Sequence, residues 1–394
     1  MQSLEGVKVL DLTRVLAGPF STMILADLGA EVIKVESLEG DEARGFGPFK
    51  NEVSGYFQNV NRGKKSIALN LKDPTGREIL LKLISEVDIL VENFRPGAMK
   101  RLGLDYPSLQ PEFPTLIYAA CSGFGQTGPY AERGAYDMII QGMGGVISIT
   151  GEPDRPPVRV GVSIGDLSAA LYTCIGILTA LFVRNQTGKG QMVDISMLDC
   201  QVALLENAIA RYDMTGEIPQ PLGARHPSIT PFQALKTKDN WIMVAAGNNN
   251  LWAKFCEAIG CHEMVHDYRF ESNELRTENH QVLQLELEKV FITKDTLDWL
   301  EILGSLDIPC GPIQSVDQVV EDPQILARNM ILTMVHPVAG PLRMSGSPIN
   351  LSETQPSITQ HAPDLGEHTN HLLHSYINAS EDEITKWRKD GIIQ

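Results

Sequence analysis

The stretch VKVLDLTRVLAGPFSTMILADLGAEVIKVE, residues 7–36, decides the fold of this chain. Residues 7–12 are mostly aliphatic and predict a buried strand. Residues 20–29 predict a short helix closed by Gly29, and residues 31–36 predict a second strand. Strand, helix and strand in this order form a βαβ unit, whose two strands run parallel. The sequence therefore predicts an α/β fold built on a parallel sheet.

Further elements of the same kind follow along the chain. Residues 74–87 predict a helix, and residues 88–94 and 115–125 predict strands. Residues 166–188 predict a long helix that ends at Gly188, and residues 192–216 begin as a strand and become a helix. These alternating elements extend the predicted parallel sheet.

The composition changes after residue 216. The segment EIPQPLGARHPSITP is rich in proline and predicts a linker. Beyond it, residues 232–247 predict a hairpin that turns at Asp239 and Asn240, and helices follow to about residue 330. We therefore predict a large Rossmann-like domain over 1–200, completed by 335–394, a linker helix over 201–224, and a smaller α+β domain over 225–334.

Length and composition limit the class of protein. The 394 residues suffice for about two domains, and 43% of them are hydrophobic. We find no run approaching the ~20 apolar residues of a membrane span, and we expect no membrane partner. The N-terminal residues enter the first strand directly, so we expect no signal or transit peptide. Six cysteines without paired spacing predict reduced thiols and a cytoplasmic protein.

The charge is unevenly distributed. A net charge of −16 argues against a nucleic-acid partner. Residues 1–101 are neutral, however, with 14 Lys and Arg against 14 Asp and Glu. Their basic residues cluster within residues 61–72 and 94–103, where a polyanionic small molecule can bind. An ordinary solvated surface explains the same clusters, so charge alone leaves both interpretations open.

Two short motifs match other classes of protein. GFGQTG, residues 123–128, fits the dinucleotide pattern G-x-G-x-x-G, but it follows a late strand and opens no apolar helix. HEMVH, residues 262–266, fits the zinc pattern H-E-x-x-H, which needs one continuous helix, whereas a helix has just ended at Gly260. We therefore expect a glycine-rich turn and no metal site.

The segment VRVGVSIGDLSAALYTCIG, residues 158–176, raises a choice between two nucleophiles. Residues 161–165 spell G-x-S-x-G, and a strand, a turn and a helix around Ser163 would form the nucleophile elbow of a hydrolase. Asp166 opens the long helix. It is either a structural N-cap, whose oxygens accept free N–H groups, or a carboxylate that attacks a thioester. The two roles of Asp166 are compatible.

Over nearly its full length the chain resembles the family III CoA-transferases, the group that contains formyl-CoA:oxalate and carnitine CoA-transferases. Within the group it looks most like succinyl-CoA:glutarate-type dicarboxylate transferases, for which residues 226–249 are the main support. The stretches that carry the family resemblance include LEGVKVLDLTRVLAGPFSTMILADLGAEVIKVE (4–36), NRGKKSIALNLKDPTG (61–76), VENFRPGAMKRLGL (91–104), RGAYDMIIQGMGG (133–145), GDLSAALYTCIGILTAL (165–181) and TGKGQMVDISMLD (187–199).

The resemblance implies a mechanism and a set of site residues. Asp166 would be the nucleophile, forming first a mixed anhydride and then an aspartyl-CoA thioester, so that neither ATP nor a metal is needed. From their place at the linker, Arg225 and His226 are either candidates to hold the second carboxylate of a diacid or ordinary polar linker residues. Acyl-CoA thioesters are substrates, and no cofactor is expected to be bound permanently. The family's CoA-contacting positions fall on Leu16, Ala17, Leu69, Asn70, Leu71, Lys72, Asn93, Phe94, Arg95, Arg101, Gly134, Ala135, Tyr136 and Asp137.

The resemblance also implies an interlocked-ring homodimer and leaves three other activities open. Oxalate transferases of the family carry glutamine where this chain has Leu16 and arginine where it has Ser37, which weakens but does not remove an oxalate or formyl-CoA assignment. α-Methylacyl-CoA racemases of the family use a histidine where this chain has Tyr136, and phenols, which ionise near pH 10, are poor bases at neutral pH. The alternative from a different class is an acyl hydrolase acting through Ser163.

Overall fold

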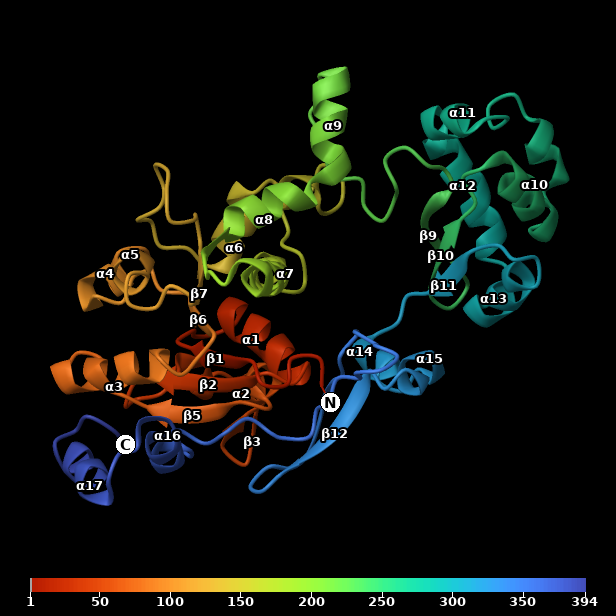
Figure 1. Ribbon diagram of the computed structural model, residues 1–394. Coiled ribbons are helices and arrows are strands. Elements are labelled where there is room, and N and C mark those ends of the chain that lie inside the picture. The colour runs from red at the N-terminus through yellow and green to blue at the C-terminus, as the bar shows by residue number, and fades with distance from the viewer. Residues whose placement is uncertain (1) are drawn as a thin grey trace. The chain divides into compact units, whose positions relative to one another are not determined.

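A six-stranded sheet is the centre of the computed structural model, which describes residues 2–394 (Figure 1). Its strand order is β5–β2–β1–β6–β7–β8, and every neighbouring pair is parallel. The predicted parallel sheet is thus confirmed. The strands are β1 (Lys8–Asp11), β2 (Glu31–Glu36), β5 (Lys65–Ala68), β6 (Ile89–Glu92), β7 (Ile117–Ser122) and β8 (Met192–Ser196).

Apolar side chains cover both faces of this sheet, as an all-parallel sheet requires. On one face Leu10 and Ile33 pack with side chains of α3 (Pro74–Ile84), α16 (Thr369–Ile377) and α17 (Glu381–Lys389). On the other face, strand residues pack with α1 (Ala17–Asp27) and α7 (Ile164–Thr187). The C-terminal helices therefore complete a core that the first hundred residues begin.

The chain divides into two compact units. The first contains residues up to 146, 159–214 and 323–394, and the second contains 147–158 and 215–322. The first unit also holds η1 (Glu42–Gly45), β3 (Phe49–Lys50), β4 (Val53–Ser54), α2 (Gly55–Asn61), α4 (Ala98–Leu102), α5 (Tyr106–Leu109), α6 (Asp137–Met143), α8 (Met197–Leu204), α9 (Glu206–Thr215), α15 (Pro323–Ala327), β12 (Ile331–His336) and β13 (Gly340–Ser345).

The second unit has its own aromatic core and a three-stranded antiparallel sheet. The predicted hairpin is confirmed as β9 and β10, with Asp239 and Asn240 between the strands. Trp252 and Trp299 are buried, and the Trp299 indole donates to the Phe291 carbonyl at 2.8 Å. Its elements are η2 (Ile147–Ile149), β9 (Phe232–Lys236), β10 (Trp241–Ala245), α10 (Asn249–Ala258), η3 (His262–His266), α11 (Asn273–Glu278), α12 (His280–Phe291), α13 (Thr296–Gly304), β11 (Cys310–Pro312) and α14 (Val316–Val319).

Two sequence-based expectations about helices are wrong. The predicted linker helix over 201–224 ends at Thr215, because Gly216 adopts a positive φ and prolines follow at 219 and 221. Among residues 2–394 there is also one helix, α7, that is long and apolar enough to cross a membrane by length and composition. Because 44% of its most apolar window is buried inside the protein, α7 is a partly buried core helix.

Candidate active site

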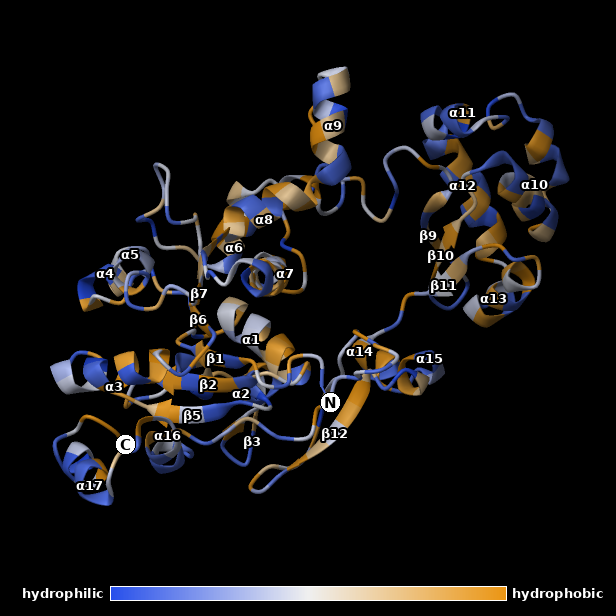
Figure 2. Ribbon diagram, viewed as in Figure 1, coloured by the Kyte–Doolittle hydropathy of each residue, from blue (hydrophilic) through white to orange (hydrophobic). Residues whose placement is uncertain are grey.

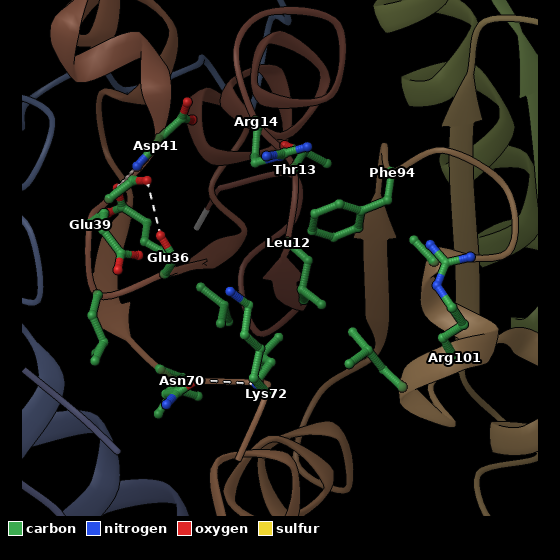
Figure 3. Close-up of a pocket in the computed structure, with 18 residues that line it drawn as sticks. Leu12, Thr13, Arg14, Glu36, Glu39, Asp41, Asn70, Lys72, Phe94 and Arg101 are labelled. Atoms are coloured by element: carbon green, nitrogen blue, oxygen red, sulfur yellow. Dashed lines mark hydrogen bonds between the residues drawn. The ribbon is translucent and has the colours of Figure 1, made fainter. Parts of the chain in front are cut away.

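Two neighbouring pockets lie at the carboxyl end of the parallel sheet, where α/β proteins bind their ligands. The larger, of about 510 Å³, is lined by residues that follow β1, β2 and β5 and by α4. Figure 3 shows Arg101 and Phe94 on one side of it, Glu39 and Asp41 on the opposite side, and Lys72 between them. The smaller pocket, of about 280 Å³, contains Asp166. Arg14 and Phe94 line both pockets, so the two are contiguous.

Asp166 does not cap α7, which corrects one of its two predicted roles. Ser163 stands at the N-cap position without a side-chain hydrogen bond, and Asp166 is the third residue of the helix. The N–H of Gly165 instead donates to Oδ1 of Asp137, at 2.8 Å. Within residues 2–394 no group donates a hydrogen bond to the Asp166 carboxyl. Its oxygens are therefore available to a substrate in the pocket.

The electrostatics of the pocket favour a protonated Asp166 near neutrality. Burial and, secondly, the negative charge of Asp137 raise the pKa of Asp166 to about 7. The N-terminal end of α7 acts in the opposite direction, because it favours the ionised form. A carboxylate of this kind is more basic, and hence a better nucleophile, than a solvated aspartate, and a substantial fraction is ionised at neutral pH.

The raised pKa predicts that Asp166 destabilises the folded protein at neutral and higher pH. In the unfolded chain an aspartate ionises near pH 4, so stability is lost as the pH rises from about 4 to about 7. Above pH 7 we expect the free energy of unfolding of Asp166→Asn to exceed that of the wild type by up to about 4 kcal/mol. This difference should shrink towards pH 4. Urea titrations at several pH values measure this, with Ser163→Ala as the control. A difference independent of pH would contradict it.

The nucleophile elbow predicted around Ser163 is absent. Residues 156–160 form no strand, and Ser163 has a φ of −75°, without the strained turn of an elbow. HEMVH is the 3₁₀ helix η3, in which residues four apart do not share a face. Within residues 2–394 no cluster of three or more His, Cys, Asp or Glu is arranged to hold a metal. Cys121 lines the Asp166 pocket, but burial raises the pKa of its thiol to about 12, which keeps it neutral.

The predicted CoA-contacting residues gather around the two pockets. Asp137 lines neither pocket and holds the first turn of α7, as described above. The Asn93 amide is engaged with the backbone: its Oδ1 accepts from Arg14 N at 2.9 Å and its Nδ2 donates to Arg14 O at 2.8 Å. The smaller pocket is lined by Leu16, Ala17, Asn93, Phe94, Arg95, Gly134, Ala135 and Tyr136, and the larger by Leu69, Asn70, Leu71, Lys72, Phe94 and Arg101.

The two predicted acceptor-binding residues belong to the second unit. Arg225 forms an isolated bridge with Gln233, and the His226 ring stacks on Phe232 with centroids 5.4 Å apart. Both residues are thus part of the approach to the hairpin β9–β10.

The sequence did not predict two residues that line the smaller pocket, Arg14 and Arg133, or Tyr56, which interacts electrostatically with Asp166. Arg14 follows β1 directly, and its position at the carboxyl end of a parallel strand was the available signal. Arg133 stacks over the rings of Tyr130 and Phe124, within a loop whose course the sequence does not reveal. Burial and, secondly, the charge of Asp166 raise the pKa of Tyr56 to about 12. The phenol of Tyr56 therefore stays protonated. No local pattern marks Tyr56.

Comparison with known proteins places the chain among CoA-transferases. A model described as CoA-transferase family III matches residues 4–369. The chain is 41% identical over 100% of its length to succinyl-CoA:glutarate CoA-transferase of Mus musculus, covering 91% of it. It is 42% identical over 92% of its length to acetyl-CoA:oxalate CoA-transferase of Acetobacter aceti, covering 93% of it. A CAIB/BAIF family protein from Brucella suis has a similar structure, with 40% identity, a TM-score of 0.84, and coverage of 94% of this chain and 99% of that one.

Proposed function

The chain belongs to CoA-transferase family III, and from this premise we propose that it moves CoA from succinyl-CoA to a dicarboxylate such as glutarate or itaconate. The observation that carries the proposal is the Asp166 carboxyl, which is partly buried, accepts no hydrogen bond within residues 2–394, and lines a pocket contiguous with the larger pocket, where Lys72 and Arg101 lie. CoA-transferase activity itself follows from the family and from relatives about 40% identical over almost their whole length.

Four acyl transfers complete the proposed cycle. The Asp166 carboxylate attacks the thioester carbonyl of the donor, the C–S bond breaks, and CoA leaves as a thiolate with a mixed anhydride on Asp166. The thiolate attacks the aspartyl carbonyl, which gives an aspartyl-CoA thioester and free succinate. The acceptor carboxylate then attacks this thioester, which releases the thiolate and leaves a second mixed anhydride between the acceptor and Asp166. The thiolate finally attacks the acceptor's carbonyl, the bond to the Asp166 oxygen breaks, and the new acyl-CoA and the free Asp166 carboxylate result. One thioester replaces another, so the cycle needs no external energy source.

The charges of the larger pocket suggest how the CoA moiety is held. Lys72 and Arg101 are cations that can pair with phosphate groups, and both belong to the segment whose neutral charge stands out in an acidic chain. We expect Lys72→Ala and Arg101→Ala each to raise KM for acyl-CoA about tenfold with kcat nearly unchanged, because these contacts are equal in the ground and transition states. Steady-state kinetics with varied succinyl-CoA measure this. A fall in kcat at constant KM would contradict it.

The acceptor is tested directly. Purified protein is incubated with succinyl-CoA and, separately, with glutarate, itaconate, methylsuccinate, malate, oxalate, formate or carnitine, and new acyl-CoA masses are read by chromatography and mass spectrometry. A new CoA thioester whose mass matches the acid in one tube identifies that acid as the acceptor. Free CoA in every tube without a new thioester would refute transfer and indicate hydrolysis. Oxalate is the second candidate, because the Acetobacter aceti relative is an oxalate transferase.

We also propose that the active form is a cytoplasmic homodimer of interlocked rings, with the first unit binding CoA. Large apolar side chains are exposed along α7, α8 and α9, more than a monomer ordinarily leaves in water, and Figure 2 shows hydrophobic residues along α8. Light scattering should give twice the chain mass of 43.3 kDa. The exposed side chains are Leu171, Tyr172, Ile175, Phe182, Val202, Leu204, Ile209, Tyr212 and Met214.

A further inference from the structure

Val15, which precedes α1, has an unusual backbone conformation. Its φ is +67°, in the left-handed region that β-branched residues avoid because the side chain approaches the backbone closely. Among residues 2–394, the other non-glycine residues with positive φ are Asn, Asp or Glu, several of which tolerate this region. Such a conformation persists only where the surrounding structure imposes it.

The Asp41 carboxylate supplies the contacts that impose it. Its oxygens accept from the N–H of Val15 at 3.2 and 3.3 Å and from the N–H of Ala43 at 2.9 Å. The same carboxylate pairs with Lys34 Nζ at 2.8 Å, and Lys34 also donates to the Thr13 carbonyl at 2.9 Å. The side chains of Lys34 and Asp41 are 0% and 1% exposed, so water does not compete for these bonds.

A second buried ion pair, between Asp11 and Lys64, holds both ends of the turn Thr13–Ala17 that contains Val15. Asp11 accepts from the N–H of Thr13 at 2.9 Å and pairs with Lys64 Nζ, also at 2.9 Å. Lys64 donates in turn to the carbonyl of Pro19, in the first turns of α1, at 3.0 Å. The turn is tight, because a side chain on Gly18 would collide with Thr13. Val15 is thus the one residue with a positive φ inside a turn that is held on both sides.

The conformation of Val15 bears on the active site through the residues that follow it. Leu16 and Ala17 line the pocket that contains Asp166. Leu16 is also the N-cap of α1, and no side chain caps this helix. A right-handed or extended conformation at Val15 would direct the chain elsewhere and move the wall formed by Leu16 and Ala17 away from the carboxyl. The wall therefore depends on a conformation that valine does not adopt unaided.

We propose that Asp41 is a positioning residue of this active site: it holds Val15 in the left-handed conformation and thereby presents Leu16 and Ala17 to the Asp166 carboxyl. Asp41 acts through Val15 and does not itself touch the reacting atoms. The catalytic part of this inference rests on the proposed transfer of CoA, whereas the conformational part does not.

A double-mutant cycle between Asp41→Ala and Val15→Gly tests the proposal. Glycine adopts a positive φ without a steric penalty, so it should no longer need the Asp41 carboxylate. We expect Asp41→Ala to lower kcat for CoA transfer by roughly 10- to 100-fold in the otherwise wild-type chain, and by less than about 3-fold in the Val15→Gly background. KM for acyl-CoA should change little, since Lys72 and Arg101 are untouched. Equal losses in the two backgrounds, or no loss at all, would overturn the proposal.

Asp27→Ala is the matched control. Asp27 is a buried carboxylate of the same unit, paired with Arg62 at 2.7 Å, and it accepts no hydrogen bond from the Thr13–Ala17 turn. Its removal should have the same effect on kcat in both backgrounds, since it does not hold Val15. If Asp41→Ala fails to fold because Lys34 is left unpaired in the interior, Lys34→Met is added to all four proteins, which removes the buried charge while the Val15 N–H still loses its acceptor in Asp41→Ala.

Melting temperatures of the four proteins give a readout that needs no substrate. Asp41→Ala should lower the melting temperature less in the Val15→Gly background than in the wild-type background. If Asp41→Ala lowers the melting temperature equally in both backgrounds, Asp41 does not hold Val15 in its conformation, and this conclusion does not depend on the enzyme's activity. Should the wild-type chain form no new acyl-CoA, the proposed function fails, and the melting cycle still decides the conformational claim.

Discussion

Replacing Asp166 by alanine is expected to lower kcat for CoA transfer by at least about 10⁴-fold, the scale on which enzymes lose activity when their covalent nucleophile is removed. The physical reason is that both proposed covalent intermediates form on this carboxyl, and neither Ser163 nor Cys121 is arranged to replace it. Succinyl-CoA turnover in the presence of the acceptor found above measures the effect. Circular dichroism and melting curves establish that the variant is folded.

Ser163→Ala is the matched control, since Ser163 lies three residues away on the same turn and its hydroxyl makes no capping hydrogen bond. We expect this variant to retain activity within a few-fold of the wild type. A wild-type sample quenched during turnover should carry the mass of CoA on a peptide containing Asp166, and the Asp166→Ala sample should not. Normal turnover by Asp166→Ala, or an adduct on a different peptide, would refute the assignment.

Replacing Asp137 by asparagine is expected to shift the pH dependence of the reaction to lower pH. The attacking species is the ionised Asp166, whose pKa is about 7 because of burial and the charge of Asp137. For the wild type, kcat/KM should therefore rise about tenfold between pH 6 and pH 8. Removing the charge of Asp137 leaves only burial to raise the pKa of Asp166. The inflection of kcat/KM should therefore move below pH 7, and the ratio of kcat/KM at pH 8 to that at pH 6 should fall.

The comparison of rates at two pH values separates this electrostatic effect from a structural one. Asparagine keeps an oxygen that can accept from the Gly165 N–H, but its amide cannot accept from Gln141, which now donates to Asp137 Oδ2 at 2.7 Å. Loss of that bond lowers activity at every pH and leaves the inflection where it is. Gln141→Ala removes the same bond without changing charge and is the control. An unmoved inflection in Asp137→Asn would show that Asp137 does not set the pKa of Asp166.

Much of the site could be predicted from the sequence, because its parts follow predictable strands. The resemblance to the family predicted Leu16, Asn93 and Phe94 as site residues, and their place after β1 and β6, at the carboxyl edge of a parallel sheet, agrees with it. Asp166 could be placed at the start of a long helix by its apolar pattern. The hairpin of the second unit followed in the same way from two short apolar runs around Asp239 and Asn240.

The rest depended on contacts between residues distant in sequence. The Gly165 N–H at the start of α7 is bonded by Asp137, 29 positions before Asp166, and not by Asp166 itself. The general preference for aspartate at helix starts does not predict this. The same holds for the elbow around Ser163, where the G-x-S-x-G pattern occurs but the strand before it does not form. A short motif lists residue types, whereas the chemistry depends on the backbone path that tertiary packing imposes.

Local patterns in the sequence were sufficient to predict the parallel sheet, five of its six strands and the long helix that carries Asp166, whereas β5 was not predicted. The periodic pattern of apolar residues, and glycine or proline at the ends of elements, act over only a few residues. They can therefore be recognised in the sequence. Only the tertiary structure decided the protonation of Asp166, the engagement of the Asn93 amide by Arg14, and the left-handed conformation of Val15. Each of these arises from burial, from a charge or from a hydrogen bond contributed by another part of the chain, and none of them exists until the chain has folded.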